Sequence, residues 1–115
     1  TNPFLSTKTI DKNIYKFLNQ NIYDSFFSVS ELKKRLWNKE TLAINHNYLD
    51  EPTTQNLEMI YEENSCLYLF SRKSFLNNAN RIGNKPKMVI VPKNESYDID
   101  DEYDFIFASN FFKTK

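Results

Sequence analysis

The sequence predicts an α/β domain in which helices pack against a parallel or mixed sheet. A helical pattern of apolar residues at 10–18 is followed by a short aromatic and β-branched run, Ser25–Ser30. Two further strand-like runs, Cys66–Phe70 and Lys87–Val91, come later, each with a helical pattern after it. Helices that alternate with strands in this way usually cover a sheet that contains parallel strand pairs. The 115 residues suffice for one small domain.

The amino-acid composition bears on which binding partners and which cell compartment to expect. The chain has 15 basic and 15 acidic residues, so no basic excess indicates nucleic acid or an anionic membrane surface as a partner. A single cysteine cannot form an internal disulfide, which fits a reducing, cytoplasmic compartment. No apolar run approaches the length of a membrane span. With Gly83 as the only glycine, these residues contain no Gly-rich phosphate loop.

The first part of the chain predicts a loop, a helix and a strand. Thr1–Leu5 reads as the end of a strand that stops at Pro3, since proline cannot donate to a central ladder. The helix is expected to begin at a hydroxyl cap near Ser6 and to end near residues 19–21. Its predicted apolar stripe is Ile10, Ile14, Phe17 and Leu18. The run Ser25–Ser30 is the first predicted strand.

Residues 31–59 have apolar side chains but little regular period, and two interpretations stay open. The stretch is either an excursion that buries its apolar side chains against another subunit, or an irregular loop packed on its own domain. Long irregular stretches are uncommon unless they are functional or disordered.

The last part of the chain predicts two strands and two helices. Cys66–Phe70 is the most apolar run and predicts the best-buried strand. A short helix capped by Ser71 follows, and then a polar loop, residues 77–85. Lys87–Val91 predicts a strand that Pro92 ends. The last helix is expected over about residues 100–112, with Phe105, Ala108 and Phe112 on one face.

Two carboxylates, Asp98 and Asp100, stand two residues apart just before the last predicted helix. Carboxylate oxygens suit Mg²⁺, which keeps several waters and shares its remaining shell with substrate phosphates. The alternative is that these acids only favour the start of a helix through its dipole.

Other polar residues offer weaker signals. His46 is the only histidine and lies in a polar string, so we expect a surface or loop histidine rather than a catalytic base. Cys66 falls within a predicted strand and is expected to behave as a small apolar residue. One cysteine and one histidine make a zinc site very improbable. Gln55 and Asn64 suit hydrogen bonding to sugar hydroxyls or a base edge, although ordinary turn chemistry also explains them.

Four segments occur in an order that resembles a known family. They are Thr54-Gln55-Asn56-Leu57, the run from Tyr61 to Phe70, Asn80-Arg81-Ile82-Gly83-Asn84-Lys85-Pro86, and the run from Glu95 to Phe105. Together they resemble the C-terminal half of the acylneuraminate cytidylyltransferases, which make CMP-activated sialic acids and related nonulosonic acids. The acidic run before the last helix is the most specific of the four.

The resemblance implies a three-layer, nucleotide-diphospho-sugar-transferase-like fold with a mixed sheet. Residues 1–115 would be the C-terminal part of a single cytidylyltransferase domain whose N-terminal nucleotide-binding strands are missing. The implied reaction is Mg²⁺-dependent transfer of CMP from CTP to a sugar acid, with release of pyrophosphate. Asp98 and Asp100 would serve the metal, and Gln55 would touch the sugar. Residues 37–60 would be the dimerisation excursion of a homodimer.

The sequence also departs from that family. Its members commonly carry an arginine where this chain has Thr53, and the Gly-rich nucleotide-binding stretch is absent from these residues. Two interpretations follow: a fragment of a cytidylyltransferase that is inactive alone, or a non-catalytic dimerisation or scaffold module derived from the fold. Without the N-terminal strands the sheet would expose an edge and an apolar face, so we expect association with a second chain.

Overall fold

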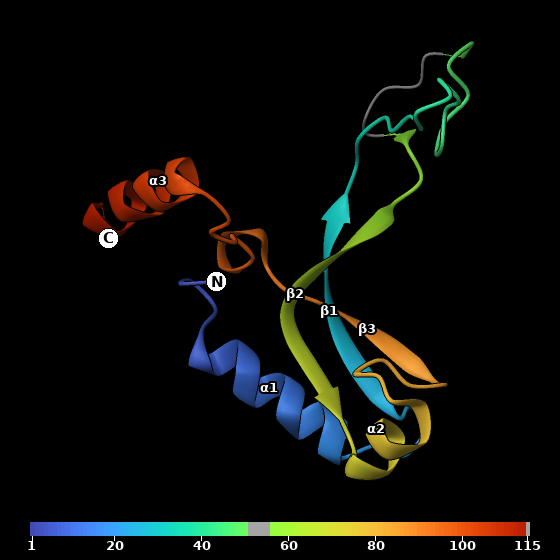
Figure 1. Ribbon diagram of the computed structural model, residues 1–115, viewed down its shortest axis with the longest axis vertical. Coiled ribbons are helices and arrows are strands. Elements are labelled where there is room, and N and C mark those ends of the chain that lie inside the picture. The colour runs from blue at the N-terminus through green and yellow to red at the C-terminus, as the bar shows by residue number, and fades with distance from the viewer. Residues whose placement is uncertain (51–55, 115) are drawn as a thin grey trace. The chain divides into compact units, whose positions relative to one another are not determined.

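The computed structural model describes residues 1–50 and 56–114 (Figure 1). It divides into two compact units, Thr1–Ser30 with Glu63–Lys115, and Glu31–Glu62. The chain is of the α/β class, as the sequence predicts, with a three-stranded sheet in the order β2-β1-β3. The elements of the sheet and its helices, in chain order, are α1 (Thr7–Leu18), β1 (Ser25–Leu32), β2 (Ile60–Phe70), α2 (Arg72–Asn78), β3 (Pro86–Ile90) and α3 (Glu102–Lys113).

The sheet is mixed. Strand β3 runs parallel to β1, with Ser25 opposite Pro86 and Val29 opposite Ile90. Strand β2 lies on the other side of β1 and runs in the opposite direction (Figure 1). The mixed sheet that the resemblance implies is therefore present in these three strands.

The core centres on β1 rather than on β2, which corrects one prediction. Phe26 and Val29 are each 1% exposed, and Ser25 and Ser28 are fully buried. By contrast, the apolar run Cys66–Phe70 is only half-buried or exposed. The physical reason is the strand order: β1 has a neighbour on both sides, whereas β2 forms one edge of the described sheet.

Helix α1 has the predicted bounds, but a different face of it is buried. The Ser6 hydroxyl caps it by accepting a bond from the Thr9 N–H (3.1 Å), and Asn19 ends it. Thr9 and Asn13 are buried, whereas Ile14 is 38% and Leu18 73% exposed. The predicted stripe of Ile10, Ile14, Phe17 and Leu18 is therefore wrong in part.

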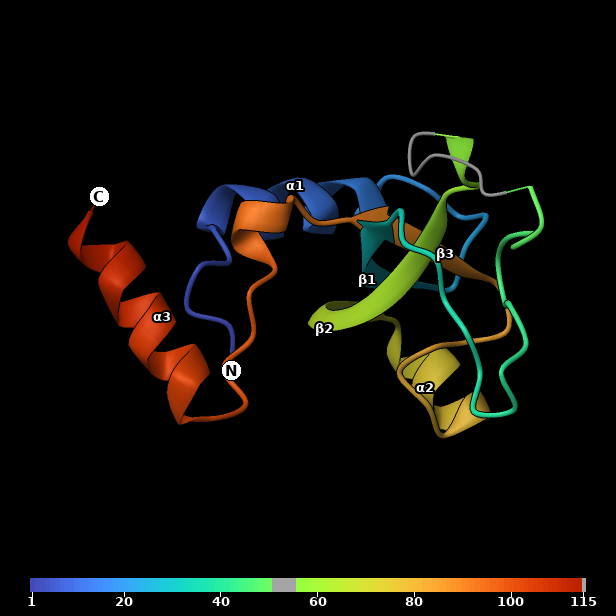
Figure 2. The same cartoon turned by 90° about the horizontal axis from the view of Figure 1, so that it is seen from above.

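Hydrogen bonds and one ring contact explain this orientation of α1. The buried Asn13 side chain donates to the Thr9 carbonyl (2.9 Å), and the Thr9 hydroxyl donates to the Glu95 carboxylate (2.9 Å). Phe17, one turn further along the same face, packs edge-on against Phe26 with centroids 5.1 Å apart. Buried polar groups are normally hydrogen-bonded, and these bonds allow polar positions 9 and 13 to be buried together with Phe17. Figure 1 and Figure 2 show α1 beside the strands of the sheet.

The predicted strand end at Thr1–Leu5 is also wrong. None of the strands that the structure describes includes Thr1–Leu5. Thr1 pairs with Ile99: its carbonyl accepts the Ile99 N–H (2.8 Å), and its amino group donates to the Ile99 carbonyl (3.5 Å). One such pair of residues does not make a ladder. Instead, the Asn2 side chain folds back and accepts the Phe4 N–H (2.8 Å), as Asn commonly does in a turn.

The two later helices lie close to their predicted positions. Ser71 caps α2 by accepting the Ser74 N–H (3.0 Å), as predicted. Helix α3 begins at Glu102, and its predicted face is right at Ala108, which is buried, and wrong at Phe105, which is exposed. Near its end, the rings of Phe111 and Phe112 lie 5.1 Å and 4.8 Å from the ring of Phe4.

The unit Glu31–Glu62 is irregular over most of its described length, as the sequence predicts. A single antiparallel bridge joins Trp37 and Ala43. The Trp37 ring contacts His46 edge-on at 5.2 Å and lies 5.6 Å from Tyr48. This small aromatic cluster and the buried Leu57 are the main apolar contacts seen in the unit.

Candidate functional site

The acidic segment at the start of α3 contains two pairs of aspartates that make different contacts: Asp101 with Asp104, and Asp98 with Asp100. Asp101 is the N-cap: its Oδ1 accepts the Asp104 N–H (2.8 Å). In return, Asp104 Oδ2 accepts the N–H groups of Asp101 (3.3 Å) and Asp100 (3.0 Å). This is a capping box, which satisfies backbone donors that the first turn leaves open. The helix-start interpretation therefore holds for Asp101 and Asp104.

The capping contacts also perturb titration. The backbone N–H of Asp100 is the largest cause that lowers the pKa of Asp104, and the Tyr97 hydroxyl adds to it with a 3.1 Å bond. The pKa of Tyr97 is raised, first by burial and then by that same bond, because ionisation would place two negative charges together. Asp104 is thus held as a carboxylate that serves the helix.

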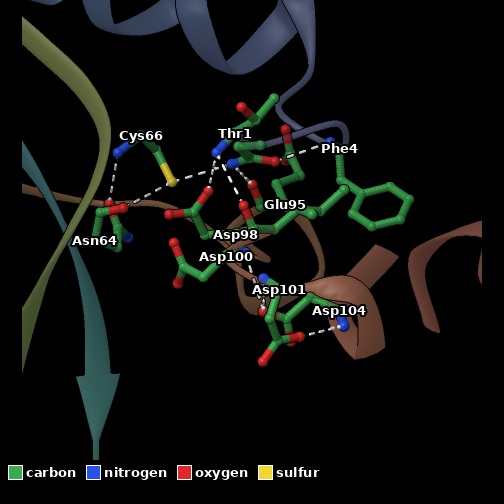
Figure 3. A network of polar contacts seen from close by, with 11 residues as sticks. Thr1, Phe4, Asn64, Cys66, Glu95, Asp98, Asp100, Asp101 and Asp104 are labelled. Carbon is green, nitrogen blue, oxygen red and sulfur yellow. Dashed lines mark hydrogen bonds and ion pairs between the residues drawn. The ribbon is translucent and has the colours of Figure 1, made fainter. Parts of the chain in front are cut away.

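Asp98 and Asp100 take no side-chain part in the capping box. Figure 3 shows their carboxylates side by side, pointing to the same side of the segment. The Asp98 Oδ1 pairs with the amino group of Thr1, which raises the pKa of that amino group, while Asp100 is exposed. The negative charge of Asp100 also raises the pKa of the Thr1 amino group, so both carboxylates lie near that group.

The chemistry of this pair fits a magnesium ion only in part. Within residues 1–50 and 56–114, no three His, Cys, Asp or Glu side chains group as metal ligands. Mg²⁺ tolerates this, since it is often bound by one or two carboxylates together with waters and substrate phosphates. Asp98 and Asp100 could supply those two carboxylates, and the remaining ligands would come from solvent and substrate.

The structure places Asn64 in strand β2, where its side chain bonds to two serines of β1. Ser65 has a positive φ of 58°, which kinks β2 at this point. The Asn64 Oδ1 accepts from the Ser28 hydroxyl (2.5 Å) and the Cys66 N–H (3.2 Å), and its Nδ2 donates to Ser30 (2.9 Å). The Ser28 hydroxyl also accepts the Leu67 N–H (2.8 Å). Asn64 therefore fastens β2 to β1, and little of its amide stays free for a substrate.

Cys66 lies between Asn64 and the aspartate pair (Figure 3). Its Sγ receives a bond from Asn2 Nδ2 (3.1 Å), and the same amide donates to the Glu95 carbonyl (2.6 Å). Burial is the main cause that raises the pKa of Cys66, and the negative charges of Asp98 and Glu95 add to it. A thiol with a raised pKa is a poor nucleophile at neutral pH, so Cys66 is not a catalytic candidate.

Glu95 and Asn2 join this site although the sequence did not single them out. Both Glu95 carboxylate oxygens accept from the Thr9 hydroxyl (2.9 Å), and Oε1 also accepts the Ser6 N–H (2.7 Å). Glu95 thus caps α1 from a distant part of the chain. The Asn-Pro pair at residues 2–3 was a local turn signal for Asn2, whereas no local signal indicated Glu95.

The remaining sequence candidates either make other contacts or lie outside the described residues. Gln55 and Thr53 lie outside the described residues. His46 lies in an irregular part of the chain, which agrees with the prediction of a loop histidine; it is half-buried beside Trp37, and its Nδ1 is 3.2 Å from Asn45 Oδ1. Arg81 stacks its guanidinium carbon 4.0 Å above the Tyr68 ring.

Comparison with known proteins identifies no family for this chain. Neither the models of protein families nor the curated proteins contain a match to the chain. Of the helices that the structure describes, none has the length and apolar character needed to cross a membrane.

Proposed function

We propose that this chain is the C-terminal part of a nucleotidyltransferase that transfers CMP from CTP to a nonulosonic, sialic-like sugar acid and releases pyrophosphate. The observation that carries the proposal is that only two of the four aspartates in the acidic segment cap α3. Asp101 and Asp104 are used to start α3, so helix capping does not account for Asp98 and Asp100. Two aspartates that share one side of a loop are suited to a nucleotide-bound metal.

The fold supports the proposal at a coarser level. A mixed α/β sheet with a parallel pair and one antiparallel edge strand is compatible with a nucleotide-diphospho-sugar-transferase-like fold. In open α/β sheets, ligands usually bind beyond the carboxyl ends of the strands. Asp98 and Asp100 follow the carboxyl end of β3 in the chain, which supports a ligand site at this end.

The residues of the chain would have simple tasks in this reaction. The sugar hydroxyl attacks the α-phosphate of CTP, and bound Mg²⁺ would neutralise charge on the phosphate oxygens. Asp98 and Asp100 would hold that ion beside the edge of β2. Asn64 would act as a positioning residue, because it fixes the kink in β2 that places Cys66 next to the aspartates. Gln55 is proposed as a contact to the sugar.

We also propose that the enzyme is a homodimer and that residues 37–60 contribute to its interface. Trp37, Leu42 and Leu49 support this, because each exposes much of an apolar side chain. Monomeric proteins rarely expose several such side chains close together.

A non-catalytic dimerisation or scaffold module is the second candidate. Two observations favour it. The Asn64 side chain makes its hydrogen bonds within the sheet, and among the described residues no third His, Cys, Asp or Glu side chain groups with Asp98 and Asp100. Activity separates the two candidates, since a module would bind its partner without turnover.

The test is an assay of pyrophosphate release by the full-length protein, with CTP, Mg²⁺ and a panel of nonulosonic acids. Asp100→Asn is expected to reduce kcat by at least about a hundredfold, because it removes a charge that acts on the transition state. Activity with none of the acids, or a fully active Asp100→Asn variant, would show the proposal to be wrong.

Asp101→Asn is the matched control. It removes one negative charge from the adjacent position, yet asparagine is as good an N-cap as aspartate. We expect this variant to keep its activity. A loss equal to that of Asp100→Asn would mean that the general negative charge of the segment matters, and not a metal at Asp98 and Asp100.

A further inference from the structure

A pocket of about 340 Å³ lies between helix α1 and strand β3. Pockets for small ligands usually have volumes of about 300–1,000 Å³. Asp98, Asp100 and Asn64 do not line it, so it is separate from the proposed catalytic site. Residues of α1, β1 and β3 form its walls, among them Lys12, Asn13, Lys16, Phe26, Lys87 and Val89.

Three lysines border this pocket and no acid does. Lys12 and Lys16 come from α1, and Lys87 comes from β3. None of the three makes an ion pair with a carboxylate in the part of the chain that the structure describes. Like charges four residues apart in a helix repel each other, so Lys12 and Lys16 do not stabilise one another. Their positive charge is left available for a ligand.

Glu95 is an acid that contacts one of the lining residues, and its hydrogen bonds hold it at the start of α1. Glu95 contacts the pocket residue Thr9, but its two carboxylate oxygens accept bonds from the Thr9 hydroxyl and the Ser6 N–H. Those bonds direct the carboxylate to the start of α1, where the helix dipole also favours a negative charge.

The pocket also has an apolar floor and a fixed ammonium group. Phe26 and Val89 are both buried. The Lys87 Nζ lies 5.3 Å from the centroid of the Tyr23 ring and 5.8 Å from that of Phe26, which is the distance range of cation–π contacts. Beside it, the Asn13 amide donates to the Thr9 carbonyl, and a primary amide has a second N–H that this bond does not use.

We propose that this pocket binds a small polyanion: a phosphate ester or diphosphate whose oxygens contact Lys12, Lys16 and Lys87. The limited volume and the zero net charge of the chain favour a small molecule over a nucleic acid. The proposal does not rest on the proposed enzymatic function, because none of its residues takes part in that reaction.

The plain alternative is that the lysines form an ordinary solvated face. Lys8, Lys12 and Lys16 are spaced four residues apart on α1, which is common on exposed helices. The pocket distinguishes them, because Lys8 lies outside it whereas Lys12 and Lys16 line it together with a lysine from another element. Lys8 is therefore a matched control for the other two.

In the test, pyrophosphate is titrated into the whole protein at low ionic strength. Binding is measured by calorimetry and by the shifts of amide NMR signals. Shifts are expected in α1 and β3. Replacement of two lysines, Lys12→Gln with Lys87→Gln, should weaken binding about tenfold or more, because each loses a charge-assisted hydrogen bond. Lys8→Gln should leave the affinity unchanged, and Lys12→Arg, which keeps the charge, should retain most of it.

Three results would overturn the proposal. The first is the absence of binding at millimolar pyrophosphate, and the second is an equal loss of affinity in Lys8→Gln. The third is tighter binding of a short RNA than of pyrophosphate, which would assign the lysines to a nucleic-acid surface. Because the NMR shifts are measured on the unaltered chain, the test does not depend on the folding of any variant.

Discussion

At the scale of single residues, Asp24 shows how strongly one side chain can fix a loop. The Asp24 carboxylate accepts the N–H groups of Asn84 (2.8 Å) and Lys85 (3.1 Å) and the Ser25 hydroxyl (3.0 Å). Burial acts to raise the pKa of Asp24, but these hydrogen bonds outweigh it and lower the pKa. Asp24 therefore stabilises the fold above the ordinary carboxyl pKa, and this contribution is lost as the pH falls through the lowered folded value.

Gly83→Ala is expected to destabilise the protein. A methyl group at position 83 would collide with the Asp24 carboxylate, which is held by its hydrogen bonds and cannot move aside freely. We expect a loss of about 1–3 kcal/mol in the free energy of unfolding, the usual range for overpacking. Urea denaturation followed by circular dichroism measures it.

Asn84→Ala is the control for this change. The Asn84 contact to Asp24 uses its backbone N–H, which alanine keeps, and its side chain is exposed. The variant should stay within about 0.5 kcal/mol of the unaltered protein. Equal stability of Gly83→Ala and the unaltered chain would mean that the loop does not close on Asp24.

The sequence predicted the roles of residues whose hydrogen-bond partners are near in the chain. It did not predict the roles of residues whose partners are far away in the chain. The caps Ser6 and Ser71 each bond a group three residues away, so their pattern is local. Glu95 binds Ser6 and Thr9, which are more than 80 residues away in sequence. Asn64 was noticed as a substrate contact, but its partners Ser28 and Ser30 gave no signal that they would use it.

At the scale of elements, α3 has a well-capped N-terminus but buries little of its surface. Its capping box joins Asp101 and Asp104, and Tyr97 donates a further bond to Asp104. Beyond this start, Ala108 is its one buried residue, while Tyr103 and Phe107 are exposed. Helix stability normally comes from a packed apolar face, so the cap should matter more than usual here.

Asp101→Ala is therefore expected to loosen α3 locally. Loss of an N-cap costs typically about 1 kcal/mol, which would speed hydrogen exchange of the α3 amides about fivefold. Exchange in β1 should not change, because that strand is held by the core. Asp101→Asn keeps the capping oxygen and should exchange as the unaltered chain does; unchanged exchange in Asp101→Ala would mean that the cap is not formed in solution.

The order and type of the elements could be predicted from periodicity, but their burial could not. The apolar run Cys66–Phe70 looked like the centre of the core, and strand order then placed it at an edge. On α1, the pairing of Asn13 with Thr9 makes polar positions suitable for the interior. Both results depend on neighbours brought in by tertiary structure, which hydrophobic pattern alone does not contain.

At the scale of the whole molecule, the exposed apolar side chains bear on assembly. In the unit Glu31–Glu62, Leu42 is 61% and Leu49 76% exposed. In the other unit, Leu18 of α1 is 73% exposed. If the proposed homodimer uses residues 37–60, only the first two leucines are buried on association.

We therefore expect Leu42→Ser and Leu49→Ser to weaken the dimer and Leu18→Ser to leave it intact. Burial of one leucine contributes about 1.5–3 kcal/mol, and a two-fold interface loses it twice. The dimer dissociation constant should then rise more than about a hundredfold, as measured by sedimentation over a range of concentrations. Since Leu18 matches these leucines in size and exposure, an equal effect of Leu18→Ser would place the interface elsewhere or indicate non-specific association. A chain that stays monomeric at all concentrations would exclude the homodimer.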